Sequence, residues 1–396
     1  MTRFFSEGWH RLISHPRPRL GHRVLLGLLC LLSLAYLLVL KAYLGLYRLK
    51  VIRPARLRPF VIGIGNLTLG GTGKTTLAAL LGRRLIEKGA RVGILLRGHT
   101  GRFRRSARLV STPTSVLMGP AEAGDEAFLL AREVPGALVA VGKDRRKSAR
   151  LVESEFPPDI LLLDDSFQYW RVKKDLEILL WDASQPPRLH RLFPRGILRE
   201  PLSHLRRADR IWLTRSDQSP ELQTHRRAIQ DVLPGRPMLM LGQEPCAVHR
   251  FDSSEEAPLE VLRGKRVLGF AAVGNPRAFE RSVAACGVSI AYSVTFPDHY
   301  QYQARDLQRL FQVASELAVD YLVTTPKDQV RLESLASPGS AISPPIPILV
   351  LETRIRPLEK DLSLEDIFEE IWQRWQQHLL PEPDSETTTD AVSQES

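Results

Sequence analysis

The sequence predicts an α/β protein with two doubly wound, P-loop or Rossmann-like α/β/α domains and an N-terminal membrane-anchoring helix. Three observations lead to this prediction. After residue 58, short continuously apolar segments alternate with amphipathic ones, which is typical of a parallel sheet covered by helices on both faces. A glycine-rich loop joins the first apolar segment to the first amphipathic one. A long apolar run flanked by basic residues precedes them all.

These patterns divide the 396 residues into four regions. We expect basic flanks and a membrane-anchor helix at 1–58, a P-loop domain at 59–235, a second, smaller α/β domain at 236–380 and a disordered acidic tail at 381–396. A hydrophobic fraction of 43% with 25% charged residues is that of a chain with buried cores, and it excludes collagen and disorder throughout. The 3 cysteines lie far apart, so neither a disulfide scaffold nor a cysteine zinc site is expected.

The expected elements follow from the lengths of the apolar and amphipathic segments. In the first domain the expected strands are 60–65, 91–96, 137–141, 160–163, 176–181 and 210–213, and the expected helices are 74–88 and 122–132. In the second domain the expected strands are 267–273, 288–295, 321–324 and 346–351, with helices between them. The polar stretch 216–220 separates the two series.

The formal net charge of +11 comes almost entirely from the N-terminal region. Residues 1–58 contain eleven Lys and Arg and a single acid, Glu7, so the rest of the chain is nearly neutral. A DNA-binding domain would carry its basic residues across a folded face. Here they flank the apolar run 24–40, where they can contact anionic lipid head groups. We therefore expect a membrane and no nucleic acid as a partner.

The apolar run of 17 residues would form a helix of about 25 Å, slightly shorter than a typical hydrocarbon core. No cleavage site of small residues follows it, which favours a retained anchor over a signal peptide. A buried core helix is the other alternative. Basic residues on both sides leave the orientation open, and the sequence leaves open whether the helix spans the membrane or lies in one leaflet.

The segment GNLTLGGTGKT at 65–75 has the features of a phosphate-binding loop. Glycines allow successive amides to point into one concave nest, the lysine reaches the terminal phosphates, and the hydroxyl that follows binds Mg²⁺. The helix that begins there adds its positive N-terminal end. The expected cofactor-binding residues are Gly70, Gly71, Thr72, Gly73, Lys74, Thr75 and Thr76. Thr68 stands where the common pattern has a glycine.

Acidic residues follow two other elements of the first domain. Asp164 and Asp165 end an apolar strand, where such folds place a Mg²⁺ ligand beside the phosphates; which of the two binds the metal stays open. Asp125 and Glu126 begin a helix, either as catalytic carboxylates that face the phosphates or as charges favourable to the helix dipole. His299 follows a strand of the second domain and could relay a proton for such an acid.

Together these segments resemble the tetraacyldisaccharide 4'-kinase (lipid A 4'-kinase) family. The resemblance extends from the anchor to about residue 335. It rests on 65–75, 95–102 (LLRGHTGR), 124–132 (GDEAFLLAR), 139–145 (VAVGKDR), 159–183, 193–209, 273–280 (VGNPRAFE), 296–302 (FPDHYQY) and 323–328 (VTTPKD). The phosphate loop of the family also lacks the first glycine.

The resemblance implies an ATP-dependent kinase that transfers the γ-phosphate to the 4'-hydroxyl of a tetraacyl glucosamine disaccharide 1-phosphate, giving lipid IVA. ATP and Mg²⁺ would be the cofactors. Lys74 would hold the phosphates, Thr75 with Asp164 and Asp165 the metal, and Asp125 would act as base, paired with His299. Glu126, Arg199 and Glu200 match other active-site positions. The implied partners are the acylated lipid and the membrane, with no obligate protein partner. The implied location is the inner membrane, with the catalytic domains on the cytoplasmic side.

The chain departs from the family pattern at four positions that could alter nucleotide or acceptor tolerance. His99 replaces a tyrosine, Ser166 a glycine, Tyr169 a histidine and Pro326 a glutamate.

Other classes of protein stay open. One is a membrane-tethered P-loop ATPase that acts as a switch or delivery factor. Another is a GTP-binding regulator, although the nearest approach to an Asn-Lys-x-Asp motif is the segment TPKD at 325–328. A third is a non-catalytic lipid-binding module, which leaves the intact phosphate loop unexplained.

Overall fold

The computed structural model describes residues 9, 12–13, 20–98, 106–253, 255–298, 300–333, 335, 344–359 and 363–379. The α-helices are α2 (Leu20–Arg48), α3 (Lys74–Glu87), α4 (Pro120–Ala123), α5 (Asp125–Glu133), α6 (Arg145–Glu155), α7 (Leu222–Gln230), α8 (Pro276–Ala285), α9 (Ala304–Glu316), α10 (Pro326–Glu333) and α11 (Leu364–Leu379). The 3₁₀ helices are η1 (Pro187–Leu189), η2 (Leu202–Arg207), η3 (Ser216–Gln218) and η4 (Leu259–Leu262). The tail 381–396, expected to be disordered, and the site candidate His299 lie outside the described residues.

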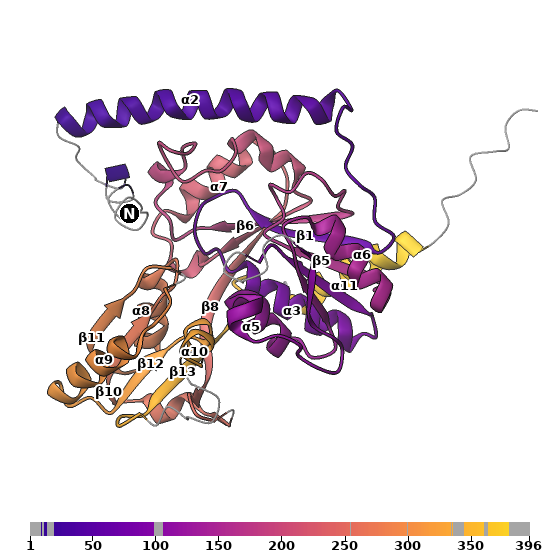
Figure 1. Cartoon of the computed structure of the whole chain (residues 1–396). Helices are drawn as coiled ribbons and strands as arrows, with labels where there is room; N and C mark the ends of the chain where they lie inside the picture. The colour runs from indigo at the N-terminus through magenta and orange to yellow at the C-terminus, as the bar shows by residue number, and fades with distance from the viewer. Residues whose placement is uncertain are drawn as a thin grey trace, which may run out of the picture.

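The strands are β1 (Phe60–Asn66), β2 (Val92–Leu96), β3 (Arg108–Ser111), β4 (Leu138–Val141), β5 (Ile160–Asp164), β6 (Leu176–Asp182), β7 (Arg210–Thr214), β8 (Met238–Arg250), β9 (Glu256–Ala257), β10 (Arg266–Ala271), β11 (Ser289–Thr295), β12 (Tyr321–Thr324) and β13 (Ile348–Pro357). Their order across the sheet is β11-β10-β12-β13-β8-β7-β6-β1-β5-β2-β4-β3, and β9 pairs with β8. Six neighbouring strands run parallel, in the order β7, β6, β1, β5, β2 and β4, and helices cover them (Figure 1). The predicted α/β fold is confirmed.

One long strand, β8, joins the two halves of the sheet. Its first residues pair in parallel with β7, and the remainder pairs antiparallel with β13. The second half of the sheet is therefore mixed, whereas the prediction described a doubly wound unit. The sequence did not predict β8, because Gly242, Pro245 and several polar residues interrupt its apolar pattern. The proposed domain boundary at residue 235 falls just before this strand.

The C-terminal helix α11 packs against the first half of the molecule, although its residues belong to the proposed second domain. Ile367, Phe368 and Ile371 are buried in the same cluster as the apolar face of α3. An ion pair between Lys88 and Glu369 adds to this contact.

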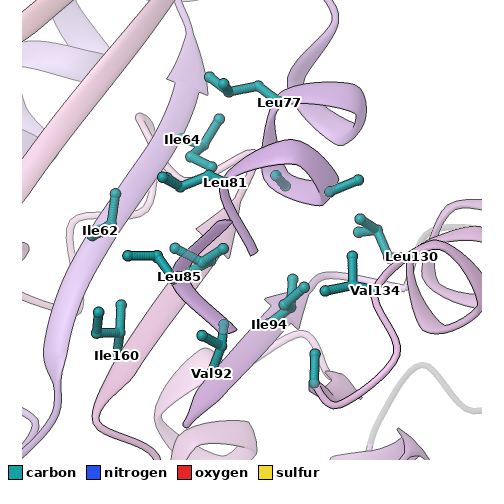
Figure 2. Close-up of a cluster of buried hydrophobic side chains, with 14 of the residues drawn as sticks. Ile62, Ile64, Leu77, Leu81, Leu85, Val92, Ile94, Leu130, Val134 and Ile160 are labelled. Atoms are coloured by element: carbon teal, nitrogen blue, oxygen red, sulfur yellow. The ribbon is translucent and has the colours of Figure 1, made fainter. Parts of the chain in front are cut away.

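The core between α3 and the sheet fixes the two ends of the phosphate loop. Leu77, Leu81 and Leu85 recur every four residues, so they lie on one face of α3 and pack against β1, β2 and β5 (Figure 2). Ile62 and Ile64 of β1 are fully buried beneath them. Because burial of one such side chain contributes about 1.5–3 kcal/mol, this core holds the strand and helix that flank the loop in one geometry.

The expected helix 122–132 is divided into α4 and α5 at Gly124. This residue has a φ of 87°, a conformation that glycine adopts without steric cost. A new helix therefore begins at Asp125, which places Asp125 and Glu126 in the first turn of α5.

The N-terminal helix α2 includes the whole predicted run 24–40. It is long and apolar enough to cross a membrane by length and composition. In Figure 1 it extends along one side of the molecule beside the segments that follow β6. Leu26, Ser33 and Leu44 are buried on one face. The exposed apolar residues are Leu20, Val24, Leu25, Leu28, Leu31, Leu32, Leu34, Leu38, Val39, Tyr43 and Leu46.

A groove between α5, α10, β8 and β13 contains Glu133 and Glu352 among its lining residues. Burial, with a further contribution from the charge of Glu352, raises the pKa of Glu133 to about 7. The folded chain therefore holds this proton more tightly than the unfolded chain does.

We expect Glu133→Gln to stabilise the protein at pH 8 and not at pH 4. As pH rises from about 4.5 to 7, the unfolded chain releases the proton first, so the native protein loses stability over that window. The neutral glutamine avoids this loss. The rise in pKa corresponds to about 3 kcal/mol, so urea unfolding should show a gain of up to that size at pH 8; an equal effect at both pH values would contradict the explanation.

Candidate active site

The phosphate loop lies between the end of β1 and the start of α3. Gly70 and Gly73 have φ angles of 104° and 90°, which side chains rarely tolerate. Gly73 directly precedes α3 and offers no side chain to cap the helix, so the first amides of the helix point toward the loop. The loop therefore has the form of an anion-binding nest at a helix N-terminus.

Two carbonyl groups of the phosphate loop accept hydrogen bonds from residues at the end of β7. Arg215 Nη1 donates to the carbonyl of Gly71 (2.9 Å), and Thr214 Oγ1 donates to that of Thr72 (3.1 Å). Thr72, Gly73 and Thr76 line a small pocket beside these residues. Sequence reasoning named the loop residues but missed Thr214 and Arg215 from the end of β7.

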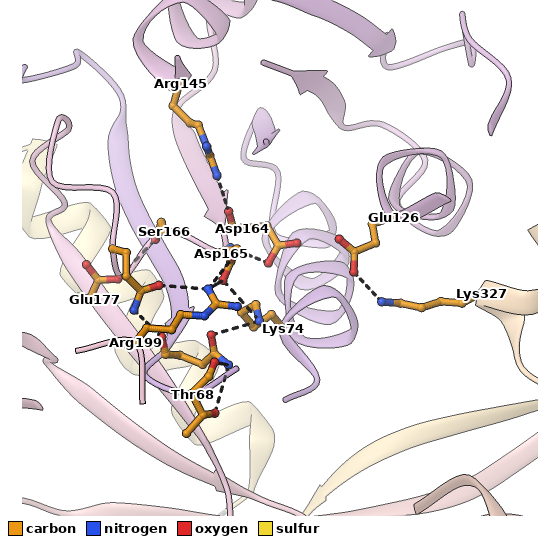
Figure 3. A network of polar contacts seen from close by, with 12 residues as sticks. Thr68, Lys74, Glu126, Arg145, Asp164, Asp165, Ser166, Glu177, Arg199 and Lys327 are labelled. Atoms are coloured by element: carbon orange, nitrogen blue, oxygen red, sulfur yellow. Dashed lines mark hydrogen bonds and ion pairs between the residues drawn. The ribbon is translucent and has the colours of Figure 1, made fainter. Parts of the chain in front are cut away.

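Lys74 lies among the polar groups at the carboxyl ends of β1 and β5 (Figure 3). Its Nζ is 3.5 Å from Asp165 Oδ1 and donates to Asn66 Oδ1 at 3.3 Å. Arg199 Nη1 donates to both oxygens of Asp165, at 2.9 and 3.1 Å. Thr75, in the first turn of α3, is buried. The structure thus brings together three of the predicted residues, Lys74, Asp165 and Arg199, and Thr75 directly follows Lys74.

The two aspartates after β5 differ in electrostatic state. Burial raises the pKa of Asp164 to about 7, and the nearby charge of Glu126 acts in the same direction. Burial also opposes ionisation of Asp165, but the charges of Lys74 and Arg199 outweigh it and lower the pKa of that carboxyl. Asp165 has a φ of 50°; such strained conformations of non-glycine residues cluster at functional sites. Its amide donates to Asp164 Oδ1 at 2.9 Å.

The carboxylates of α5 pair with two cations of α10, from the other half of the sheet. Arg331 Nε and Nη2 donate to Asp125 Oδ2, and Lys327 Nζ donates to Glu126 Oε1 at 2.7 Å. The side chain of Arg331 is 1% exposed and that of Asp125 is 5% exposed. Burial lowers the pKa of Arg331, but the charges of Asp125 and Asp328 outweigh it and raise the pKa overall. Both predicted carboxylates of α5 are therefore held from across the molecule.

Asp328, in the segment TPKD that is nearest to a base-reading motif, has a structural role. It accepts hydrogen bonds from Arg331, Tyr302, Thr325 and the amide of Ala272, and it is fully buried. This carboxylate supports Arg331, so the GTP-binding interpretation gains nothing from it.

The segments next to His299 lie near this cluster. The charge of Asp298 acts on Lys327 and on Arg331. A Cβ atom on Gly274 would lie 2.8 Å from the amide nitrogen of Gly71 and 3.1 Å from Asp298 Oδ2. The loop after β10 therefore packs directly on the phosphate loop, and only glycine fits between them.

Glu200 is placed differently from its neighbour Arg199. Its buried carboxylate accepts from Arg207 and from Trp170 Nε1, and it lies 2.8 Å from His204 Nδ1. These contacts attach η2 to the segment that precedes it.

The departure at Tyr169 is accommodated on the other side of the acidic pair. The Tyr169 hydroxyl donates to Asp144 Oδ1 (2.8 Å) and accepts from the amide of Arg145 (3.0 Å). The Arg145 guanidinium lies over the tyrosine ring and donates to the carbonyl of Asp164 at 3.5 Å. Burial lowers the pKa of the Arg145 guanidinium. The sequence did not predict a role for Arg145, although its position after a parallel strand points to the same sheet edge.

This arrangement fits a metal–nucleotide complex better than a metal alone. Within the described ranges, no group of three or more His, Cys, Asp or Glu could hold a metal ion. Mg²⁺ usually takes one or two carboxylates and completes its shell with water and phosphate oxygens. Asp164, Asp165 and the Thr75 hydroxyl could supply such hard oxygen ligands, and a divalent cation bound there would relieve the repulsion between Asp164 and Glu126.

An amide nest with its lysine binds phosphates, and carboxylates placed opposite can act on a second substrate or on water. The fold and the site thus define a P-loop nucleotide-binding protein of the phosphotransferase or hydrolase class.

Comparison with known proteins narrows this class. The family model for tetraacyldisaccharide-1-P 4'-kinase matches residues 25–372, so the chain belongs to this family. The resemblance found in the sequence is confirmed. The chain is 34% identical over 359 residues to a tetraacyldisaccharide 4'-kinase of Syntrophus aciditrophicus, covering 89% of this chain and 95% of the relative. It is 36% identical over 315 residues to that of Geobacter metallireducens, covering 80% and 91%.

A solved structure is similar over the same extent. The crystal structure of LpxK from Aquifex aeolicus in complex with ATP superimposes with a TM-score of 0.67 and 27% sequence identity. The match covers 89% of this chain and 99% of that one.

We expect Arg331→Met to reduce the free energy of unfolding by about 3 kcal/mol or more, because it leaves Asp125 and Asp328 buried without their guanidinium. The matched control is Arg132→Met. Arg132 also joins α5 to α10, through Glu333, but its side chain is 40% exposed, so about 0.5 kcal/mol or less is expected. Urea denaturation of both variants measures the difference; equal losses would contradict the burial argument.

Proposed function

We propose that this chain transfers the γ-phosphate of ATP to the 4'-hydroxyl of a tetraacyl glucosamine disaccharide 1-phosphate, in lipid A biosynthesis. Membership of the family supports the reaction. The observation that carries the proposal for this chain is the pairing of α5 with α10: it holds Asp125 and Glu126 in the first turn of α5, and the charge of Glu126 reaches Asp164 beside Lys74.

In this proposal each residue has a distinct role. The amides of Gly70 to Lys74 bind the phosphates, and Lys74 neutralises charge that develops on the transferred group. Thr75 with Asp164 or Asp165 would hold Mg²⁺, which supplies further neutralisation of the phosphates. Arg199 keeps Asp165 beside Lys74. Asp125, oriented by Arg331, accepts the proton of the acceptor hydroxyl as the base, with His299 as its partner.

The direct test is transfer of label from ATP to the acceptor lipid in detergent micelles with Mg²⁺. Lys74→Ala and Asp125→Ala should each lower the rate by on the order of 10²–10³-fold, the cost of removing a preorganised charge. Lys88→Ala, at the other end of α3, should leave the rate unchanged, since its partner Glu369 is remote from the loop. Hydrolysis of ATP without labelled lipid would instead favour the membrane-tethered ATPase.

We further propose that the protein acts at the cytoplasmic side of the inner membrane and that α2 lies in the membrane surface. Contacts with the folded chain extend along the helix from Leu26, which packs near Leu189, to Tyr47, whose ring lies 5.9 Å from that of Trp170. A helix attached over this length cannot leave the folded domain to cross a bilayer, and its exposed leucines face away from the domain. An apolar face with basic flanks is typical of an interfacial helix.

Leu31→Lys and Leu38→Lys test this placement, since these side chains are 65% and 60% exposed. Each should weaken co-sedimentation with anionic phospholipid vesicles by about tenfold or more, because one buried leucine contributes about 1.5–3 kcal/mol. Activity on acceptor in micelles should stay within about two- to three-fold of wild type. Leu379→Lys, which is equally exposed on α11, is the control; unchanged vesicle binding by the α2 variants would refute the placement.

A further inference from the structure

Two polar side chains within the apolar run 24–40 of α2, Ser33 and Tyr36, contact the segment 192–200. The hydroxyl of Tyr36 donates to the carbonyl of Arg199 at 2.8 Å. Ser33 Oγ, which is buried, lies 2.9 Å from the carbonyls of both Leu29 and Leu192, to either of which it can donate, and it accepts from the amide of Arg195 at 3.1 Å. The face of α2 that meets the folded chain therefore determines the path of this segment.

The other side of the same segment pairs with the phosphate loop. The amide of Leu69 donates to the carbonyl of Ile197 at 2.7 Å, and the amide of Arg199 donates to the carbonyl of Leu67 at 2.8 Å. A bridge between Thr68 and Leu198 completes a short antiparallel ladder. The segment 192–200 thus lies between α2 and the residues that lead into the glycines of the loop.

Arg199 links Tyr36 and the phosphate loop to the acidic residue Asp165. Its carbonyl is bound by Tyr36 and its amide by the phosphate loop, while its guanidinium binds Asp165 and Gln168 Oε1. Asp165 in turn lies 3.5 Å from Lys74 Nζ. A continuous series of polar contacts therefore runs from the hydroxyl of Tyr36 to the lysine of the phosphate loop.

We propose that Tyr36 is a positioning residue of the kinase: by fixing the main chain at Arg199, its hydroxyl places the guanidinium on Asp165 and keeps the phosphate loop in its binding geometry. In addition to attaching the protein to the membrane, α2 then forms part of the support of the active site. The inference rests on the proposed function for its catalytic consequence, but its structural part stands on the contacts alone.

Tyr36→Phe is the appropriate variant because it removes one oxygen atom and retains the ring, which packs edge-on against Phe193. The change leaves the carbonyl of Arg199 without this donor at a part-buried contact. Tyr43→Phe is the matched control, since its hydroxyl contacts only the neighbouring Tyr47 hydroxyl, at 3.0 Å, among the described residues and is exposed.

The experiment uses the full-length protein and two readouts. The first is kcat for phosphoryl transfer to acceptor in detergent micelles, where attachment to a bilayer is not needed. Tyr36→Phe should lower kcat by roughly three- to ten-fold, the size of one hydrogen bond, and Tyr43→Phe should not. In an Arg199→Ala background the Tyr36→Phe change should have a smaller further effect on kcat, because that background removes the guanidinium but keeps the main-chain carbonyl that Tyr36 binds.

The second readout is amide hydrogen exchange in the peptides that contain Leu69 and Arg199, which does not depend on the identity of the acceptor. Exchange should be faster in Tyr36→Phe than in Tyr43→Phe. Faster exchange with no kinase activity in the wild-type protein would overturn the proposed function and leave the structural link in place. Unchanged exchange and unchanged kcat, or a loss of vesicle binding alone, would overturn the inference and show that Tyr36 serves only as a membrane-surface aromatic residue.

Discussion

The buried ion pair between Arg331 and Asp125 is the interaction on which the rest of the site depends. It joins the first turn of α5 to α10, and with Lys327 and Glu126 it brings two halves of one sheet together at the phosphate loop. Removing two charges from water costs several kcal/mol per ion and is compensated only by close, well-satisfied geometry. Arg331 approaches this condition because its Nη1 donates to Asp328 and to the carbonyl of Ala272, in addition to the two bonds from Nε and Nη2 to Asp125. The pair therefore specifies one relative placement of the Asp125 carboxylate and the phosphate loop.

The second constraint is the convergence of charge at the carboxyl ends of β1 and β5. Lys74, Arg145 and Arg199 surround Asp164 and Asp165, and the balance leaves one carboxyl ionised and the other with a raised pKa. Such a site is suited to a ligand that brings both negative phosphates and a divalent cation. The contacts from α2 through the segment 192–200 extend this network to the helix that we place at the membrane surface. The acylated acceptor and the nucleotide would thus meet at the phosphate loop, which the α5–α10 ion pairs and the contacts from α2 both reach.

The sequence predicted the parts of this site that depend on local geometry. A strand, a glycine loop and a helix in succession place Lys74 and Thr75 without reference to the rest of the chain, and parallel strands bring Asp164 to the same edge. It could not identify Lys327 and Arg331 as the partners of Glu126 and Asp125, because those contacts join residues about two hundred positions apart. It also did not predict β8, because a glycine and a proline interrupt the apolar pattern of a strand that pairs with neighbours on both sides. Nor did it predict the break at Gly124, after which α5 begins at Asp125. The role of Arg145 depends on its burial, which spacing does not reveal.

The central claim is that a nucleotide on the phosphate loop faces a carboxylate held by α10. It is tested most directly by a crystal structure of the protein with Mg²⁺ and a non-hydrolysable ATP analogue. The account predicts phosphates against the amides of residues 70–74, with the terminal phosphate on the side of Lys74 that faces Asp125 and with the Arg331 pair intact. A nucleotide bound elsewhere, or an Asp125 released from Arg331 and turned away from the terminal phosphate, would contradict it.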